Sequence, residues 1–156
     1  MTFDLDFVGW IMGRPREVVA RSAAWRGVTG EVEALLTYDE GRTATVLASG
    51  VLPASFPFTT GFRVQFEDAS FETQTVIDGG DFSNTTRLYS REGAGDPQLP
   101  GANPYQVELE QFVSCVRGEA DVALLDVERA IEALDLSLAV QRSLAEGGPI
   151  RLEDAA

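Results

Sequence analysis

The sequence contains no histidine and no lysine, and these two absences exclude several kinds of catalytic site. Without histidine, neither a Ser-His-Asp triad nor a Cys-His pair can form. Without lysine, the chain has no lysine base, no Schiff base and no GxxxxGK[ST] phosphate loop. The acid–base chemistry that remains is that of carboxylates.

Cysteine is nearly absent as well, since Cys115 is the single thiol. One cysteine cannot form an internal disulfide, and a cysteine-based metal site would lack its usual histidine co-ligand. Cys115 lies within an apolar helical pattern, so we expect a small buried core residue rather than a nucleophile. The acidic residues show no EF-hand spacing, so the sequence predicts no metal site.

Basic residues are few: twelve arginines stand against 25 acidic residues, which gives a net charge of −13. The arginines form no cluster, so the chain lacks the cationic face that nucleic acid or an anionic membrane requires. No run approaches ~20 apolar residues, and no basic start precedes a short apolar run. We therefore expect a soluble cytoplasmic protein whose acidity serves solubility, with neither a nucleic-acid nor a membrane partner.

What is present suits one globular domain, residues 1–156, with 44% hydrophobic residues. The first third of the chain predicts a helix and a hairpin. Residues 4–13 have apolar side chains at helical spacing, and Asp4 is placed to cap the start. Residues 17–26 read as a strand. Apolar and polar side chains alternate along residues 31–38 and 43–50, and Asp39-Glu40-Gly41 between them is typical of a turn. This pattern predicts a hairpin.

The middle third predicts a second hairpin, with arms at residues 62–66 and 71–75 joined by Glu67-Asp68. Residues 85–91 read as a further strand. Residues 92–104 are dense in glycine and proline and read as a loop.

Two helices close the chain. The first begins at Asn103-Pro104 and ends at Gly118, with an apolar stripe at Tyr105, Leu109, Phe112, Val113 and Val116. The second runs from about Asp126 to Glu146. Its expected buried face is Val127, Ile131, Leu134 and Leu138, although Leu136, Val140 and Leu144 widen the apolar surface. Gly147-Gly148-Pro149 ends the helix. Residues 150–152 can add an edge strand.

Strands grouped together with helices at the ends indicate an α+β fold. We expect an open-faced, mostly antiparallel sheet with helices packed on one face. The other face would then be free for oligomerisation, most simply as a dimer. The interface candidates on that face are Phe62, Val64, Phe66 and Phe71.

Motifs that could carry chemistry are weak. Gly93 and Gly95 form a Gly-x-Gly, but the third glycine is missing and the context is a proline-rich loop, so no dinucleotide site is predicted. Close carboxylate pairs occur at Asp4/Asp6, Glu108/Glu110 and Asp126/Glu128. With 25 acids such pairs arise by chance, and the last pair suits a helix N-terminus. Packing is likewise the favoured role of Trp10, Trp25 and Tyr105, with ligand contact the alternative.

Four segments together resemble a known family. Residues 4–20, 61–72, 103–119 and 126–152 resemble, in order and spacing, the C-terminal domain of the Gfo/Idh/MocA oxidoreductases. In that family an N-terminal Rossmann half binds NAD(P). The C-terminal half is an open antiparallel sheet that walls the site of a sugar or cyclitol and builds dimers or tetramers through its free face. The resemblance implies the same fold here and the same oligomerisation through the free face of the sheet.

The chain departs from the family in its reactive groups. The family's glycine fingerprint and Glu-Lys-Pro lysine belong to the Rossmann half, which these residues do not contain. The family's His-x-x-Asp motif would end at Asp6 and place its histidine at position 3, where this chain has Phe3. The resemblance thus implies no catalytic residue and no cofactor bound by this chain, with NAD(P) only if a Rossmann partner exists.

Three hypotheses follow. The first is a non-catalytic oligomerisation and substrate-wall domain, either truncated from a Rossmann half or partnering one; its substrate-side candidates are Asp4, Asp6, Trp10, Arg87 and Tyr105. The second is a stand-alone module for a carbohydrate-like ligand, held by sheet residues such as Arg63, Arg87 and Tyr89. The third is a cofactor-free enzyme, for example an isomerase or hydrolase, that uses Asp4 and Asp6.

Overall fold

The structure is a computed structural model that describes residues 1–97, 103–123 and 125–152, without the side chain of Trp25. The chain divides into two compact units, Met1–Val51 with Glu108–Ala156, and Leu52–Val107. The α+β class is confirmed: the described residues form three α-helices and two open, antiparallel, four-stranded sheets. The expected open sheet is thus two sheets, each with its own strand order.

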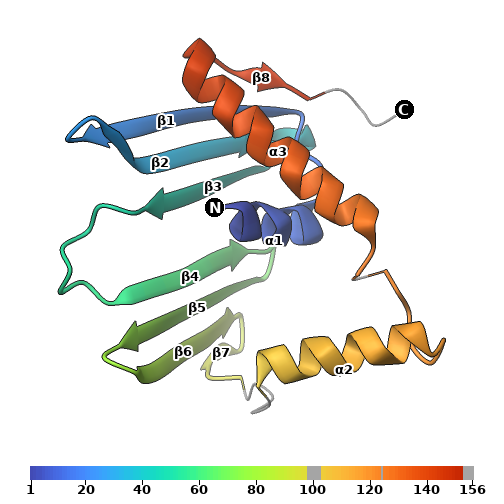
Figure 1. Ribbon diagram of the computed structural model, residues 1–156. Helices are drawn as coiled ribbons and strands as arrows, with labels where there is room; N and C mark the ends of the chain where they lie inside the picture. Colours follow the sequence, from blue (N-terminus) through green and yellow to red (C-terminus); the bar gives the residue numbers. More distant parts are fainter. Residues whose placement is uncertain (98–102, 124, 153–156) are drawn as a thin grey trace. The chain divides into compact units, whose positions relative to one another are not determined.

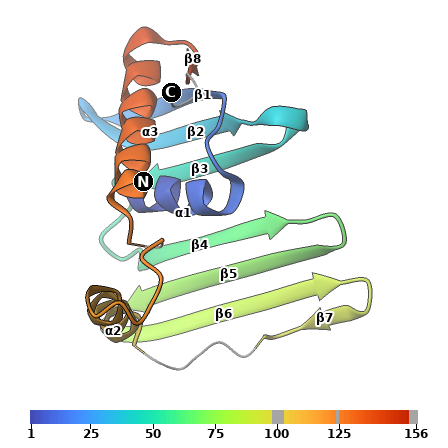
Figure 2. The ribbon, with the colours of Figure 1, turned by 90° about the vertical axis from the view of Figure 1, so that its right-hand side faces the viewer.

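The first unit is a sheet covered by two helices. Its strands are β1 (Glu17–Trp25), β2 (Val28–Thr37), β3 (Thr43–Ser49) and β8 (Ile150–Arg151), in the order β3-β2-β1-β8. The predicted edge strand at 150–152 is therefore confirmed as β8. Helices α1 (Thr2–Met12) and α3 (Val127–Glu146) pack together on one face of this sheet, as Figures 1 and 2 show.

The core of this unit lies between the sheet and the two helices. Strand alternation brings Val18, Ala20, Ala34, Leu36 and Val46 to the helix side, where Leu5 of α1 and several residues of α3 bury them. Each fully buried aliphatic side chain contributes roughly 1.5–3 kcal/mol. This unit therefore has its own apolar core.

The buried face of α3 differs from the predicted one. The helix buries Ala133, Leu136, Ala139, Val140 and Ser143, whereas Val127, Ile131, Leu134 and Leu138 are 46–64% exposed. At about 3.6 residues per turn the two sets lie on opposite sides of the helix. The small side chains of the buried set let α3 approach Ala20 and Ala34 closely, which the larger aliphatic side chains would prevent.

Local turn chemistry explains the hairpins. The predicted pairing of 31–38 with 43–50 is confirmed as β2 with β3, connected through a short 3₁₀ turn, η1 (Asp39–Gly41). Strands β1 and β2 also form a hairpin, whose turn residues Arg26 and Gly27 both have positive φ. Two consecutive positive-φ residues are what the tight two-residue turn requires.

The second unit is a sheet of four consecutive strands. They are β4 (Phe58–Gln65), β5 (Ala69–Asp78), β6 (Asp81–Ser90) and β7 (Gly93–Gly95), in sequence order. The predicted hairpin at 62–75 is confirmed. The strand expected at 85–91 begins earlier, because Gly79 and Gly80 form a tight turn with positive φ. Part of the expected loop 92–104 is strand β7; residues 98–102 lie outside the described residues.

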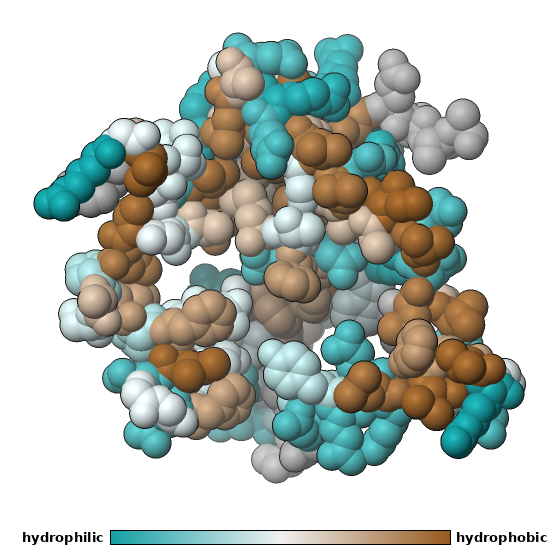
Figure 3. All heavy atoms as spheres, in the orientation of Figure 1, coloured by the Kyte–Doolittle hydropathy of each residue, from teal (hydrophilic) through white to brown (hydrophobic). Residues whose placement is uncertain are grey.

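Helix α2 (Pro104–Val116) begins as predicted: Asn103 Oδ1 accepts a hydrogen bond from the Tyr105 backbone N–H at 3.0 Å. None of its described side chains is buried, so the apolar stripe from Tyr105 to Val116 is exposed. Figure 3 shows these hydrophobic side chains over α2. Cys115 is accordingly only partly buried, which corrects the expectation of a core thiol; its Sγ lies 3.2 Å from the Asp121 carbonyl oxygen.

The other predicted caps have mixed outcomes. Asp126 caps α3 by accepting from the Glu128 backbone N–H at 3.2 Å, and Gly147 ends the helix in the left-handed conformation. Asp4 does not cap α1, because it lies inside the helix and binds the Met1 ammonium group at 3.0 Å. No described helix is long and apolar enough to cross a membrane.

Candidate functional site

A hollow opens where the start of α1 meets the start of α3. Its volume is about 270 Å³. Thr2, Phe3 and Asp6 line it from α1, and Asp126 and Arg129 line it from the first turn of α3. The hollow is close to the lower limit of about 300 Å³ for small-molecule pockets.

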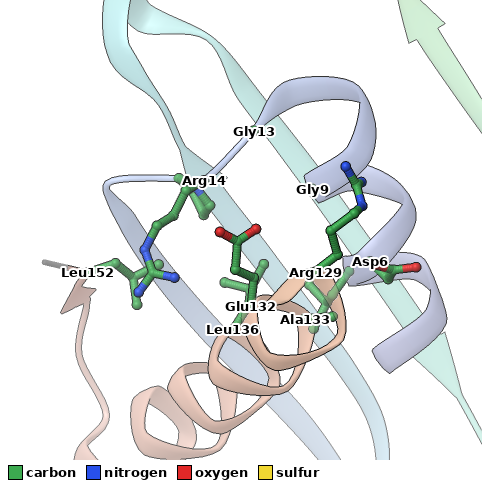
Figure 4. Close-up of a pocket in the computed structure, with 11 residues that line it drawn as sticks. Asp6, Gly9, Gly13, Arg14, Arg129, Glu132, Ala133, Leu136 and Leu152 are labelled. Carbon is green, nitrogen blue, oxygen red and sulfur yellow. The ribbon is translucent and has the colours of Figure 1, made fainter. Parts of the chain in front are cut away.

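A second, smaller cavity continues from this hollow and shares Asp6, Arg129 and Ala133 with it. Its volume of about 30 Å³ has room for roughly one water. Figure 4 shows the carboxylate of Glu132 pointing into the space between Arg14 and Arg129. The carboxyl group of Asp6 points away from this space.

The sequence places these groups through helix spacing. Phe3 and Asp6 are three residues apart, so they lie on one side of α1, while Leu5 is buried against the core. Asp126 is fixed by its capping bond, and Arg129 follows one turn later. The result is an aromatic ring beside two carboxylates and a guanidinium group, a set that can accept and donate hydrogen bonds to a polyhydroxyl compound.

Asp4 and Asp6 lie in different environments. Asp6 lines both cavities, whereas Asp4 lines neither of them and is bound to the Met1 ammonium group. The third hypothesis requires a concave site that contains both carboxylates, and neither of these two cavities contains both. Nor do the described residues contain a group of three or more acidic or cysteine side chains suited to a metal ion.

The remaining substrate-side candidates are not among the residues that line these two cavities. Trp10 is half-exposed on α1, with its ring 6.0 Å from that of Phe7. Arg87 belongs to the second unit, where it pairs with Asp96 at 3.5 Å and lies 5.9 Å from the Tyr89 ring. Tyr105 is exposed at the start of α2. Arg129, which lines the hollow, was not among the sequence candidates.

The sheet of the second unit has two chemically different faces. The register places one set of side chains together on what we call the uncharged face: Phe58, Thr60, Phe62, Val64, Phe71, Thr73, Thr75, Ile77, Phe82, Asn84, Thr86 and Leu88. The opposite face carries Arg63, paired with Glu72 at 3.0 Å, together with Arg87. Among the described residues of this unit only Thr86 is buried; on the uncharged face the rings of Phe58 and Phe82 are exposed, and those of Phe62 and Phe71 are partly buried.

Three of the interface candidates lie on the uncharged face. Phe62 and Phe71 stack with ring centroids 5.8 Å apart, and Val64 lies opposite Phe71. Phe66 follows the end of β4 and is half-exposed. Sequence reasoning missed Phe58, Ile77 and Phe82, although the two-residue alternation of β4 and β5 continues through the first two of them.

The Gly-x-Gly segment does not form a dinucleotide cradle. Gly93–Gly95 is strand β7, paired with Leu88–Ser90 of β6. A dinucleotide site needs a glycine turn between a strand and the N-terminus of a helix. This segment therefore does not fit a dinucleotide.

Comparison with known proteins gives one family and a set of similar folds. A model of the oxidoreductase family, C-terminal alpha/beta domain (GFO_IDH_MocA_C), matches residues 1–152. No curated protein matches the sequence.

Solved structures match most of this chain. The putative oxidoreductase yvaA from Bacillus subtilis has a TM-score of 0.69 and 18% identity, over 97% of this chain and 51% of its own. A putative NADPH-dependent oxidoreductase from Desulfitobacterium hafniense has a TM-score of 0.77 and 14% identity, over 96% of this chain and 46% of its own. The WlbA dehydrogenase from Bordetella pertussis, solved with NADH and UDP-GlcNAcA, has a TM-score of 0.60 and 16% identity, over 99% and 44%. The chain spans about half the length of these proteins.

Proposed function

Since this chain belongs to the family of Gfo/Idh/MocA oxidoreductase C-terminal domains, we propose that it is the substrate-wall and assembly half of an NAD(P)-dependent enzyme acting on a sugar or cyclitol. A nucleotide-binding half, on the same or a separate polypeptide, supplies the cofactor. The 156 residues by themselves transfer no hydride.

The observation that carries this proposal is the family match over residues 1–152 of a chain that spans about half of its solved relatives. The residues agree with it in two ways. The Gly93–Gly95 segment is a strand and not a dinucleotide cradle, and position 3 holds Phe3, which can neither take nor give a proton. Phe3 and Asp6 nevertheless line a hollow, as a wall of a substrate site requires.

The exposed apolar stripe of α3 supports the proposal that a nucleotide-binding half packs against this helix. Val127, Ile131, Leu134 and Leu138 form a row of large aliphatic side chains on the side of α3 that faces away from the sheet, and Figure 3 shows hydrophobic residues exposed along this helix. A helix that is apolar on two opposite sides is typical of burial between two layers. The sheet is one layer, and the nucleotide-binding half is the proposed second.

Titration with NADH tests the proposal. The 156-residue chain should show no saturable NADH fluorescence change up to millimolar concentration. The product expressed together with the coding sequence immediately upstream, or with a neighbouring nucleotide-binding subunit, should saturate at micromolar NADH. Stoichiometric binding by the 156 residues alone would overturn the proposal, and so would the lack of any nucleotide-binding half in the longer product.

The hollow at α1 and α3 favours one alternative, a stand-alone module for a carbohydrate-like ligand. Its lining of Phe3, Asp6 and Arg129 suits hydroxyl groups. A thermal-shift screen with sugars and cyclitols decides between the two functions. Stabilisation of the chain alone by one of these ligands, lost in Arg129→Met but kept in Arg117→Met, supports the stand-alone module. Uniform lack of stabilisation rejects it.

A further inference from the structure

A wide groove lies beside the C-terminal part of α3, with a volume of about 820 Å³. Arg14 lines it from the turn after α1, Arg142 from α3 and Arg151 from β8. The other lining residues are Leu152, which follows β8, and four residues of α3: Asp135, Leu138, Gln141 and Ala145. Three elements that are far apart in the sequence thus each bring one arginine to this groove.

The charge of the groove is opposite to that of the chain. Its lining has three arginines and one carboxylate, that of Asp135, so its net charge is +2, whereas the whole chain carries −13. A carboxylate outside the lining, that of Glu17, lies 3.8 Å from Arg151 Nε. A groove lined mainly by one sign of charge concentrates its electric field and attracts ions of the other sign. The lining therefore favours an anion.

Two of these arginines have no partner within the described part of the chain. The side chains of Arg14 and Arg142 make no ion pair or hydrogen bond there, although the chain has 25 acidic residues for 12 arginines. Figure 4 shows the side chain of Arg14 extending toward Leu152, which also lines the groove. The guanidinium N–H groups of both residues are therefore available to an external anion.

The arrangement fits a phosphate group better than a carboxylate. A planar carboxylate is matched by the two parallel N–H groups of a single arginine. A phosphate group is tetrahedral, so its oxygens can accept hydrogen bonds from arginines on different sides of a groove. The volume lies within the range of about 300–1,000 Å³ typical of small-molecule pockets, and Leu138, Ala145 and Leu152 offer apolar contacts to an organic part of the ligand.

We propose that this groove binds a phosphorylated small molecule, with its phosphate group between Arg14 and Arg142 and with Arg151 at the rim. The groove shares no lining residue with the hollow that contains Phe3 and Asp6. The inference thus goes beyond the proposed function and does not depend on it.

Pyrophosphate is the probe, and isothermal titration calorimetry of the full chain at low ionic strength measures its binding. Because the chain as a whole repels anions, saturable binding of one pyrophosphate per chain reports a local cationic site. We expect a Kd of about 1 mM or below. Arg14→Gln and Arg142→Gln should each raise the Kd about tenfold, since each removes charge-assisted hydrogen bonds. Arg142→Lys keeps the charge but loses the planar fork, so it should raise the Kd less than Arg142→Gln does.

Arg117→Gln is the matched control. Like Arg14 and Arg142, Arg117 is exposed and its side chain has no ion pair or hydrogen bond in the described part of the chain, but it does not line the groove. This variant should leave the Kd within about twofold. All of these substitutions are at exposed positions, so thermal unfolding without pyrophosphate should match that of the wild type.

Several results would overturn the inference. The wild type could fail to bind pyrophosphate saturably, or Arg14→Gln and Arg142→Gln could leave the Kd unchanged. Citrate that binds as tightly as pyrophosphate would contradict the preference for phosphate. Glu153 and Asp154 follow Leu152 in the sequence; pyrophosphate binding by Glu153→Gln/Asp154→Asn but not by the wild type would assign the groove to the chain's own acids. The NADH titration remains a separate test of the proposed function, because it reports on the nicotinamide ring, which pyrophosphate lacks.

Discussion

Tyr38 is an unusual residue in the core of the first unit. Its side chain is 4% exposed, and its hydroxyl group has no hydrogen-bond partner among the described residues. Burial raises the pKa of Tyr38 to about 12, against a smaller opposing effect of the nearby Arg42 guanidinium. The folded chain thus holds the phenol proton more tightly than the unfolded chain, whose tyrosine has a pKa of about 10.

This shift predicts an alkaline loss of stability. Below pH 10 both states keep the proton, so the free energy of unfolding does not depend on Tyr38. Between about pH 10 and 12 only the unfolded state releases it, so stability falls as pH rises. Urea unfolding at pH 8 and pH 11 should show a smaller decline in Tyr38→Phe than in the wild type. An equal decline in the two proteins would contradict this account.

Ser143 joins α3 to the sheet and to its own C-terminal turn. It is fully buried; its Oγ accepts from the Ala20 backbone N–H at 2.8 Å and donates to the Gly148 carbonyl oxygen at 2.6 Å. Ser143→Ala leaves a buried N–H without a partner. We expect it to lower the free energy of unfolding by about 1–3 kcal/mol.

Ser137→Ala is the control for that variant, since Ser137 is partly exposed and bonds mainly within its own helix, to the Ala133 carbonyl oxygen at 2.8 Å. Its cost should be about 0.5 kcal/mol or less. Urea denaturation measures both changes. Equal costs would show that the bond to Ala20 does not stabilise the packing of α3.

Among the elements, α3 offers the sharpest contrast between two leucines. Leu136 is 5% exposed against the sheet, whereas Leu134 is 54% exposed on the opposite side. In the chain alone, Leu136→Ala should cost about 2–5 kcal/mol of unfolding free energy. Leu134→Ala should cost less than about 1 kcal/mol.

The same leucine pair tests the proposed nucleotide-binding half. If a longer product binds NADH as proposed, Leu134→Ala should be more destabilising there, because the exposed apolar stripe of α3 would then be buried. Thermal unfolding of both products with and without the substitution measures this. An unchanged cost in the longer product would argue against a second layer on α3.

At the level of elements, the sequence predicted what depends on neighbouring residues. Asn103-Pro104, Asp126 and Gly147 carry capping chemistry, and they mark helix boundaries in the structure. The hairpins followed from alternation and turn residues. The β5–β6 turn was missed, although Gly79-Gly80 signals it. The division into two sheets depends on pairings that no local pattern specifies.

The sequence could not specify contacts between distant segments. Two apolar stripes run along α3, and periodicity alone cannot tell which of them meets the sheet. Asp6 could be proposed from its motif position, but Arg129 could not, since nothing near it in the sequence indicates that this turn of α3 lies beside α1. Long-range packing thus decided both the buried face and the lining of the hollow.

For the whole molecule, the two units differ in how they are stabilised. The first encloses an apolar core between its sheet and two helices. The second exposes most of its large apolar side chains, including Phe58 at 65% and Phe82 at 69%. An antiparallel sheet without a buried apolar face is marginally stable in water. We therefore predict that the second unit is stabilised by association with a surface outside the chain.

Hydrogen–deuterium exchange at two protein concentrations tests this dependence most directly. Amides of β1 and β2 should be protected equally at nanomolar and at high micromolar concentration, because their core is internal. Amides of β5 and β6 should exchange fast when dilute and slowly when concentrated, since association stabilises them by mass action. Strong protection of β5 and β6 that does not change with concentration would contradict the account.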